Sequence, residues 1–275
     1  MAAITATVLS IGGNPLQNAR PRPLRSLLIT SPIHLRRFNP LQLQVRLHLT
    51  TRPISRRNLW VAATSLWDAI TSSLTGGQNS AREAALAVRR GMQLFVQGDV
   101  EQSVVEFDKA IELDPRQKKY LWQRGLSLYY LNRFEEGATQ FRDDVAANPN
   151  DTEESIWCFL CEAQIDGVDE ARRRFLEVGL DPRPVMRKAY LMFKNGGDPQ
   201  EIITEFSNRR EQYYFYAALY ASLYYEAQKD PIAAEAAMIA ASCSPYGLRS
   251  GDYMASLAKV HCKCRGWKIE GSSMA

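Results

Sequence analysis

Two groups of cysteines are the residues of this sequence whose spacing could support chemistry. Cys158 and Cys161 belong to the string Trp-Cys-x-x-Cys, which resembles the active site of thioredoxins. In thioredoxins the motif follows a strand and opens a helix, whereas here it falls inside a segment with helical periodicity. Residues three apart on a helix share a face, and cysteine is among the most buried residue types. The spacing therefore favours core packing, with a thiol-redox protein using Cys158 and Cys161 as the alternative.

The second group is the string His261-Cys262-Lys263-Cys264, which offers three soft ligands for zinc. A structural zinc site needs a fourth ligand, and Cys243 is the only nearby thiol in the sequence. The odd number of cysteines, 5, also cannot form a complete set of disulfides. We expect neither a metal nor a cofactor.

The chain offers few residues for catalysis. Of its 3 histidines, His34 and His48 lie in a basic N-terminal stretch, which leaves His261 for acid–base, nucleophilic or metal chemistry. The motifs G-x-x-x-x-G-K-[ST], G-x-G-x-x-G, H-E-x-x-H and G-x-S-x-G do not occur. We therefore expect a protein that is not an enzyme.

Charge is divided unevenly along the sequence. Residues 1–67 contain nine arginines, no lysine and no acid, and the first acidic residue is Asp68. Subtracting these nine from the 34 basic residues leaves 25 against 30 acidic ones, so the remainder carries about −5. Because phosphate binding needs a clustered positive surface, this acidic body argues against nucleic acid as the main partner.

The basic leader, 1–67, has the composition of a transit peptide and linker: it carries arginine, serine and threonine but no acids. Its uncharged first 19 residues are typical of chloroplast rather than mitochondrial import, with the mitochondrion as second choice and a retained basic arm as the alternative. Ser55-Arg56-Arg57-Asn58-Leu59-Trp60 weakly resembles a twin-arginine signal, so stroma, thylakoid and thylakoid lumen all stay open. The longest apolar segment, 213–225, is too short for an integral membrane span, and peripheral membrane association stays open.

The elements that hold these residues are predicted by a repeat with a period of 34 residues. Small residues, phenylalanines and prolines recur at this spacing. Small residues allow two helices to approach closely, phenylalanine fills the space between helix pairs, and proline ends the second helix. The matching positions are Gly91 and Gly125; Ser103, Gly137 and Ala171; Phe107, Phe141 and Phe175; and Pro115 and Pro149.

These columns are the tetratricopeptide-repeat (TPR) pattern, in which each repeat is an antiparallel helix pair. After a lead-in at 68–83, the pattern predicts repeats at 84–117 and 118–151, a degenerate third repeat at 152–185 and a fourth at 214–247. The irregular segment 186–213 contains two short predicted helices at 184–194 and 199–206, with Asp198 as the N-cap of the second. A capping helix is expected within 248–267. The predicted fold is all-α, a TPR-type α-solenoid.

The order of these parts resembles the bacterial NlpI lipoprotein family and its plant organellar TPR-like relatives over about 83–267. The most specific element is Ile-Trp-x-x-Leu-x-x-Ala in the segment 154–163, followed later by Tyr214-Phe215-Tyr216. The resemblance implies a non-catalytic adaptor that brings substrates to C-terminal processing proteases or helps assemble membrane complexes. The transit-like leader replaces the lipoprotein signal of that family, so only the scaffold role is carried over.

The inner surface of such a solenoid, contributed by the first helix of each repeat, would bind other proteins or peptide segments. The inward positions carry Val88, Met92, Gln123, Glu153 and Trp157, which lack the basic clamp that binds chaperone carboxylates. The stripe Tyr213, Tyr216, Tyr220 and Tyr224 suits either a core or an aromatic binding wall. Arg172–Arg174 and Arg209–Arg210 would either lie on a solvated face or bind an acidic tail. The predicted partner-binding residues are Val88, Met92, Gln123, Ser127, Tyr216 and Tyr220.

Overall fold

The computed structural model of the chain describes residues 77–269, and every regular element in this range is a helix. The range is 79% helical and contains no strand, so the all-α prediction is confirmed for the described part. The predicted transit peptide and linker, 1–67, and most of the lead-in, 68–83, lie outside the described residues. All that follows concerns the described residues 77–269.

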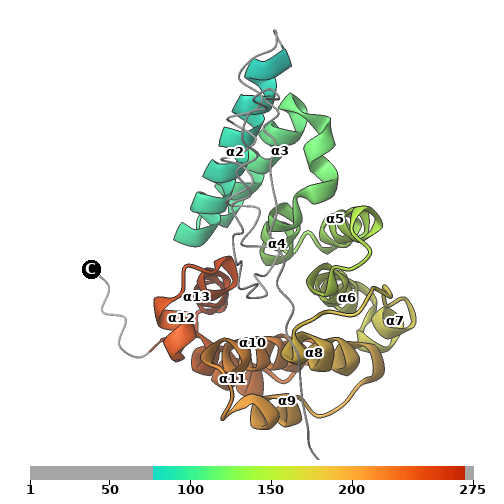
Figure 1. Cartoon of the computed structure of the whole chain (residues 1–275), viewed down its shortest axis with the longest axis vertical. Helices are drawn as coiled ribbons and strands as arrows, with labels where there is room; N and C mark the ends of the chain where they lie inside the picture. The colour runs from blue at the N-terminus through green and yellow to red at the C-terminus, as the bar shows by residue number, and fades with distance from the viewer. Residues whose placement is uncertain (1–76, 270–275) are drawn as a thin grey trace, which may run out of the picture. The chain divides into compact units, whose positions relative to one another are not determined.

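The helices follow one another with connections of at most four residues, except for the ten residues 174–183 between α7 and α8 (Figure 1). Their bounds are α2 Gly77–Gln97, α3 Val100–Leu113, the 3-10 helix η1 Pro115–Tyr120, α4 Trp122–Tyr130, α5 Phe134–Ala147, α6 Thr152–Asp166, α7 Val168–Arg173, α8 Pro184–Asn195, α9 Pro199–Phe206, α10 Glu211–Ala227, α11 Pro231–Cys243, α12 Pro245–Arg249 and α13 Tyr253–Arg265.

The first two predicted repeats contain the helix pairs α2–α3 and α4–α5. The turn inside each pair has one residue with a left-handed backbone, Gly98 (φ 81°) and Asn132 (φ 58°), at positions 34 apart. This conformation is common only for glycine and asparagine, so each residue ends the first helix and starts the reversal. Asp114 then caps η1 by accepting a hydrogen bond from the Arg116 backbone N–H at 3.2 Å.

The glycine and phenylalanine columns meet inside each pair. A methyl group on Gly91 would lie 2.8 Å from the ring of Phe107, and one on Gly125 would lie 2.6 Å from the ring of Phe141. Both rings are completely buried. The glycines are therefore needed because the ring of the second helix lies directly against the backbone of the first.

The column of small residues on the second helices contacts the next repeat. The hydroxyls of Ser103 on α3 and Ser127 on α4 are 2.9 Å apart, and a Cβ on Gly137 of α5 would lie 2.9 Å from the Cys161 sulfur on α6. Each small residue thus marks where one helix pair approaches the following pair.

The segment between the third and fourth predicted repeats has the two helices that its sequence predicts. Helices α8 and α9 occupy the predicted segments to within one residue. The side chain of Asp198 accepts a hydrogen bond from the Gln200 backbone N–H at 2.8 Å, which confirms its role as N-cap. Helix α8 packs on α6 and α10, and α9 packs on α10.

Helix α10 is the centre of the C-terminal part. It pairs with α11, and its side chains are buried from Phe215 to Tyr224. The last helix, α13, packs against α11 and α12 and also against α2, the first described helix. Figure 1 shows α13 next to α12 and facing the end of α2. The capping role predicted for this helix stays a prediction; the structure shows that α13 contacts both α11 and α2.

Candidate functional site

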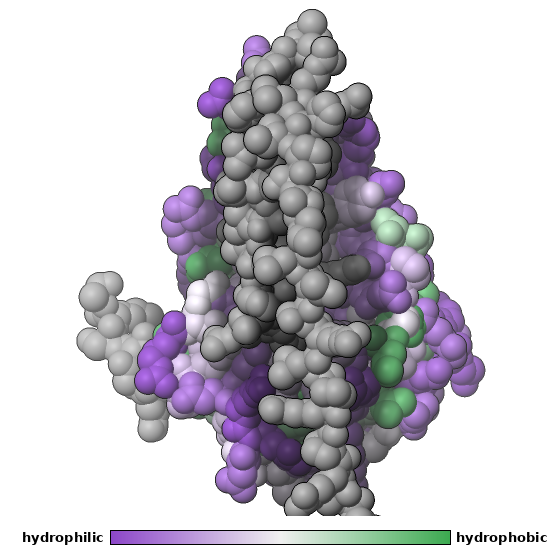
Figure 2. All heavy atoms as spheres, viewed as in Figure 1, coloured by the Kyte–Doolittle hydropathy of each residue, from purple (hydrophilic) through white to green (hydrophobic). Residues whose placement is uncertain are grey.

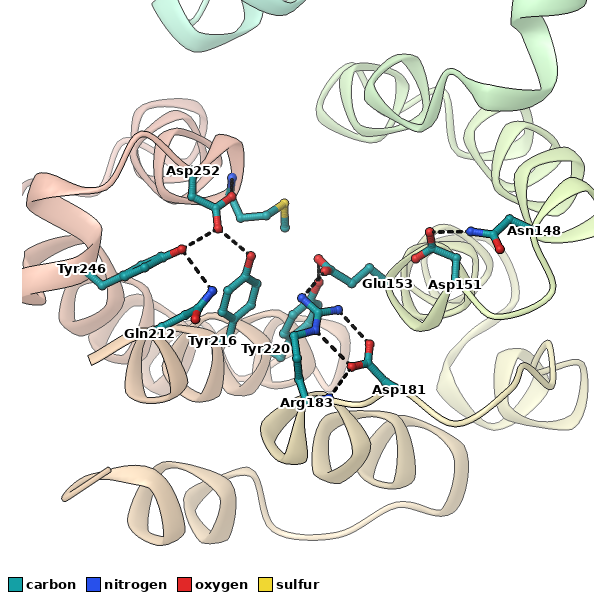
Figure 3. Close-up of polar contacts among 11 residues, drawn as sticks. Asn148, Asp151, Glu153, Asp181, Arg183, Gln212, Tyr216, Tyr220, Tyr246 and Asp252 are labelled. Atoms are coloured by element: carbon teal, nitrogen blue, oxygen red, sulfur yellow. Dashed lines mark hydrogen bonds and ion pairs between the residues drawn. The ribbon is translucent and has the colours of Figure 1, made fainter. Parts of the chain in front are cut away.

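Two tyrosine hydroxyls of α10 lie at the centre of a buried polar network (Figure 3). The hydroxyl of Tyr220 donates to Glu153 Oε2 on α6 at 2.6 Å, and that of Tyr216 donates to Asp252 Oδ2 at 2.7 Å. The two rings are stacked with centroids 6.2 Å apart. Both tyrosines are at most 1% exposed, so their hydroxyls need partners inside the protein.

Arg183, just before α8, is the cation of this region. Its guanidinium contacts Glu153 Oε1 at 2.9 Å and Asp181 at 2.8 and 3.0 Å, and it lies over the Tyr216 ring with its Cζ 5.5 Å from the ring centroid. Burial alone would lower the pKa of Arg183, but the carboxylates of Glu153 and Asp181 outweigh it and raise this pKa. The guanidinium therefore stays charged and joins α6 to the start of α8.

Asp252 likewise joins helices through its side chain, at the start of α13. Its Oδ1 accepts the Met254 backbone N–H at 3.0 Å, which makes it the N-cap, and its Oδ2 accepts the hydroxyls of Tyr216 and Tyr246. Gln212 on α10 in turn donates to the Tyr246 hydroxyl at 3.2 Å. These contacts fix α12 and the first turn of α13 on α10, and they complete a polar network that runs from α6 to α13.

A second buried polar cluster lies at the other end of α13. Nδ1 of His261 is 3.0 Å from the Tyr130 hydroxyl on α4, and its Nε2 is 3.1 Å from Glu226 Oε2 on α10. Arg265 contacts the other oxygen of Glu226 at 2.6 Å. Burial lowers the pKa of His261, and Glu226 opposes that shift. Burial would raise the pKa of Glu226, but His261 and Arg265 together lower it.

The predicted partner-binding residues fall into two groups. On α2, Val88 and Met92 are half-buried and keep part of their surface exposed. On α4, Gln123 is buried with Nε2 3.9 Å from the Met92 sulfur, and Ser127 is buried against Ser103. The buried Tyr216 and Tyr220 form the second group, as the core interpretation of the tyrosine stripe predicts. The role of all six in partner binding stays a prediction.

The cysteines of the thioredoxin-like string lie within α6 and are at most 1% exposed. Burial raises the pKa of Cys158 to about 12 and raises the pKa of Cys161 as well. Reactive thiols in proteins have a lowered pKa and an accessible sulfur, so both side chains have the properties of packing residues. Over residues 77–269, no group of three His, Cys, Asp or Glu side chains is placed to hold a metal ion.

Of the two predicted arginine faces, Arg172–Arg174 makes contacts within the protein, whereas Arg209 and Arg210 are exposed. Arg173 pairs with Glu170, and Arg174 pairs with Asp166 and Glu170. Arg172 donates to the Tyr224 hydroxyl at 2.9 Å, an interaction that the sequence did not indicate. Both polar clusters contain residues that the sequence reasoning missed: Tyr130, Asp181, Arg183, Gln212, Glu226, Tyr246, Asp252 and Arg265. A lone arginine between Pro182 and Pro184, two residues after Asp181, is the one local signal that could have directed attention to this segment.

The face seen in Figure 2 is mostly hydrophilic over the described residues, with hydrophobic side chains in small patches. Among the described helices, none has both the length and the apolar character to cross a bilayer. No known protein-family model matches the sequence.

Proposed function

We propose that this chain is a non-catalytic scaffold of the tetratricopeptide-repeat type that binds other proteins. The recurrence of the same contacts at a spacing of 34 residues is the observation that carries this proposal. Gly91 meets Phe107 as Gly125 meets Phe141, and Ser103 faces Ser127 as Gly137 faces Cys161. Helix pairs that repeat in this way stack into solenoids, and natural solenoids use their extended inner surface for binding.

The polar network supports a binding role because it makes the framework rigid. Glu153, Arg183 and Tyr220 join three helices through buried, charge-assisted hydrogen bonds. A surface that is held in one conformation loses less entropy when a partner docks on it. The partly exposed Val88 and Met92 are our choice for direct contact with that partner.

The resemblance to the NlpI lipoprotein family and its plant organellar relatives gives the proposal two specific forms. The first is the assembly or stabilisation of a membrane complex, and the second is the presentation of substrates to a C-terminal processing protease. The acid-free leader with nine arginines supports delivery to an organelle, with the chloroplast as first choice.

Affinity capture from purified chloroplasts tests this proposal. The full chain, with a tag at its C-terminus, would be expressed in the plant, crosslinked in the organelle and captured, and its partners would be identified by mass spectrometry. Subunits of a membrane complex would support assembly, whereas a peptidase would support substrate presentation. If repeated captures return no stoichiometric partner, the scaffold proposal is contradicted.

A pair of matched variants tests the proposed surface. Met92→Lys places a charge on the half-buried face of α2, and Ile232→Lys places the same charge on α11, where the isoleucine is 82% exposed. We expect the first variant to lose the captured partner and the second to keep it. Equal retention by both variants would exclude the α2 face as the contact.

A further inference from the structure

Helix α13 contacts α2, the first of the described helices, as well as α11 and α12, which precede it directly in the chain. Its Tyr253 ring stacks on Phe95 of α2 with centroids 5.4 Å apart and meets Trp122 of α4 edge-on at 5.3 Å. Near its other end, the Lys263 ammonium donates to the backbone carbonyl of Gln97 at 3.2 Å. Because α13 also packs on α11, it holds the first helix pair against the last one.

His261 lies in the middle of these contacts and is completely buried. The groups that face it come from three helices: the Tyr130 hydroxyl from α4, the Glu226 carboxylate from α10, and Arg265 and the Trp267 ring from α13 and the residues after it. A carboxylate can only accept, so the hydrogen of the neutral ring is on Nε2, which lies 3.1 Å from Glu226 Oε2 at an angle too bent for a hydrogen bond. Nδ1 then accepts the hydroxyl hydrogen of Tyr130.

With a neutral imidazole the charges of this cluster balance. Glu226 contributes one negative charge and Arg265 one positive charge, and the two side chains contact each other at 2.6 Å. Tyr129, whose ring also faces Arg265, stays neutral because burial raises its pKa further. A second proton on His261 would add a positive charge without a new carboxylate to balance it.

That second proton would also cost a hydrogen bond. Protonated Nδ1 carries a hydrogen of its own, so the Tyr130 oxygen would have to accept and its O–H would have to turn away. Tyr130 is only 6% exposed, and a buried hydroxyl that loses its acceptor is destabilising. The contact between α4 and α13 is therefore weakened in two ways by a single proton.

We infer that α13 is an acid-sensitive latch. Protonation of His261 releases α13 from α2 and α4 and uncovers the side chains that are packed between these three helices. The released state exposes the rings of Phe95, Trp122 and Tyr253. This inference concerns regulation and holds whether or not a partner binds at Val88 and Met92.

The direction of the effect follows from linkage. An imidazole in water has a pKa near ~6.5, and burial lowers the pKa of His261 in the closed state. The open state therefore binds the proton more tightly, and the ratio of open to closed molecules rises by up to ~tenfold for each pH unit below about 6.5 until the closed-state pKa is reached. Glu226, whose pKa is lowered, stays ionised through this range.

Hydrogen exchange of the full chain between about pH 5.5 and 7.5 tests the latch, with rates corrected for the intrinsic effect of pH. We expect α13 and the C-terminal turns of α2 to lose protection on acidification, while α6 keeps it. The chain has 3 histidines, so His34→Gln/His48→Gln provides the matched control, which should respond like the wild type. His261→Gln should show no acid response.

A second variant tests the charge balance if His261→Gln does not fold. Arg265→Gln removes the cation and lets a protonated His261 balance Glu226, so acid should open α13 less than in the wild type, with only the loss of the Tyr130 hydrogen bond remaining. The latch is excluded if α13 in the wild type keeps its protection across the range. It is equally excluded if α6 opens together with α13, or if Arg265→Gln responds to acid as the wild type does.

Discussion

The hydroxyl oxygens of Ser103 and Ser127 lie 2.9 Å apart, and Gly137 and Cys161 face each other at the same two positions one repeat later. The equivalence follows from the numbering, since 103 and 137 differ by 34, as do 127 and 161. Cys161 therefore occupies the position of a small residue at a contact between helix pairs. Its place in the thioredoxin-like string is explained by packing, without a requirement for redox chemistry.

Alkylation of the native protein should separate these cysteines. Cys243 and Cys264 are exposed, whereas Cys158, Cys161 and Cys262 are buried. Because burial raises the pKa of Cys158 to about 12, almost none of this thiol is ionised near neutral pH. We expect iodoacetamide to modify the two exposed cysteines first and to reach the other three only in urea. Peptide mass spectrometry measures the order, and early modification of Cys158 would revive the thiol-redox alternative.

Gly125→Ala should destabilise the protein despite the better helix propensity of alanine. The added methyl group would lie 2.6 Å from the buried ring of Phe141. Overpacking of this kind costs about 1–3 kcal/mol, against a gain of about 1 kcal/mol from propensity. We expect the free energy of unfolding in urea to fall by up to about 2 kcal/mol. Gly251→Ala, where no atom lies within 4 Å of the new methyl, is the control and should change little.

Tyr220→Phe removes the hydroxyl that donates to Glu153 at 2.6 Å in the buried network. The carboxylate loses a donor in a place where water does not replace it, which costs about 1–3 kcal/mol. Thermal unfolding followed by circular dichroism measures the loss. Tyr225→Phe on the same helix is the matched control, because that ring is only half-buried, and it should cost much less. Equal effects of the two substitutions would contradict the importance of the network.

Lys229→Gly should stabilise the turn between α10 and α11. Lys229 has a left-handed backbone with φ 63°, which a side chain with a Cβ tolerates poorly. We expect a gain of about 1 kcal/mol in the free energy of unfolding, since glycine is favoured at this position after a helix. Lys229→Ala keeps the Cβ and loses the contact with Gln164, so it should show no gain.

The sequence predicts best the helices whose positions depend on residues nearby in the chain. The positions of α8 and α9 follow from Pro184, Asp198 and Pro199, which act on the turn beside them. The glycine and phenylalanine columns predict helix pairs because their partners lie at a constant offset. All-α character therefore needs no knowledge of distant contacts.

The candidate site depends on contacts that no local pattern contains. Tyr216 donates to Asp252, 36 residues later, and Tyr220 donates to Glu153, 67 residues earlier. A tyrosine stripe fits a binding wall or a core equally well until these partners are known. The same holds for Arg183, whose neighbours Pro182 and Pro184 suggest only a turn.

The contact between Tyr130 and His261, which are separated by 131 residues in the chain, also affects how the protein folds. An open array of repeats can fold from any point, and each repeat adds its own share of stability. Here the N-terminal helix pair obtains part of its packing only after α13 has been synthesised and has crossed back to it. Contacts between residues so far apart in the sequence slow folding and make unfolding more nearly all-or-none. A substitution that destabilises α13 should therefore also destabilise α2 and α3.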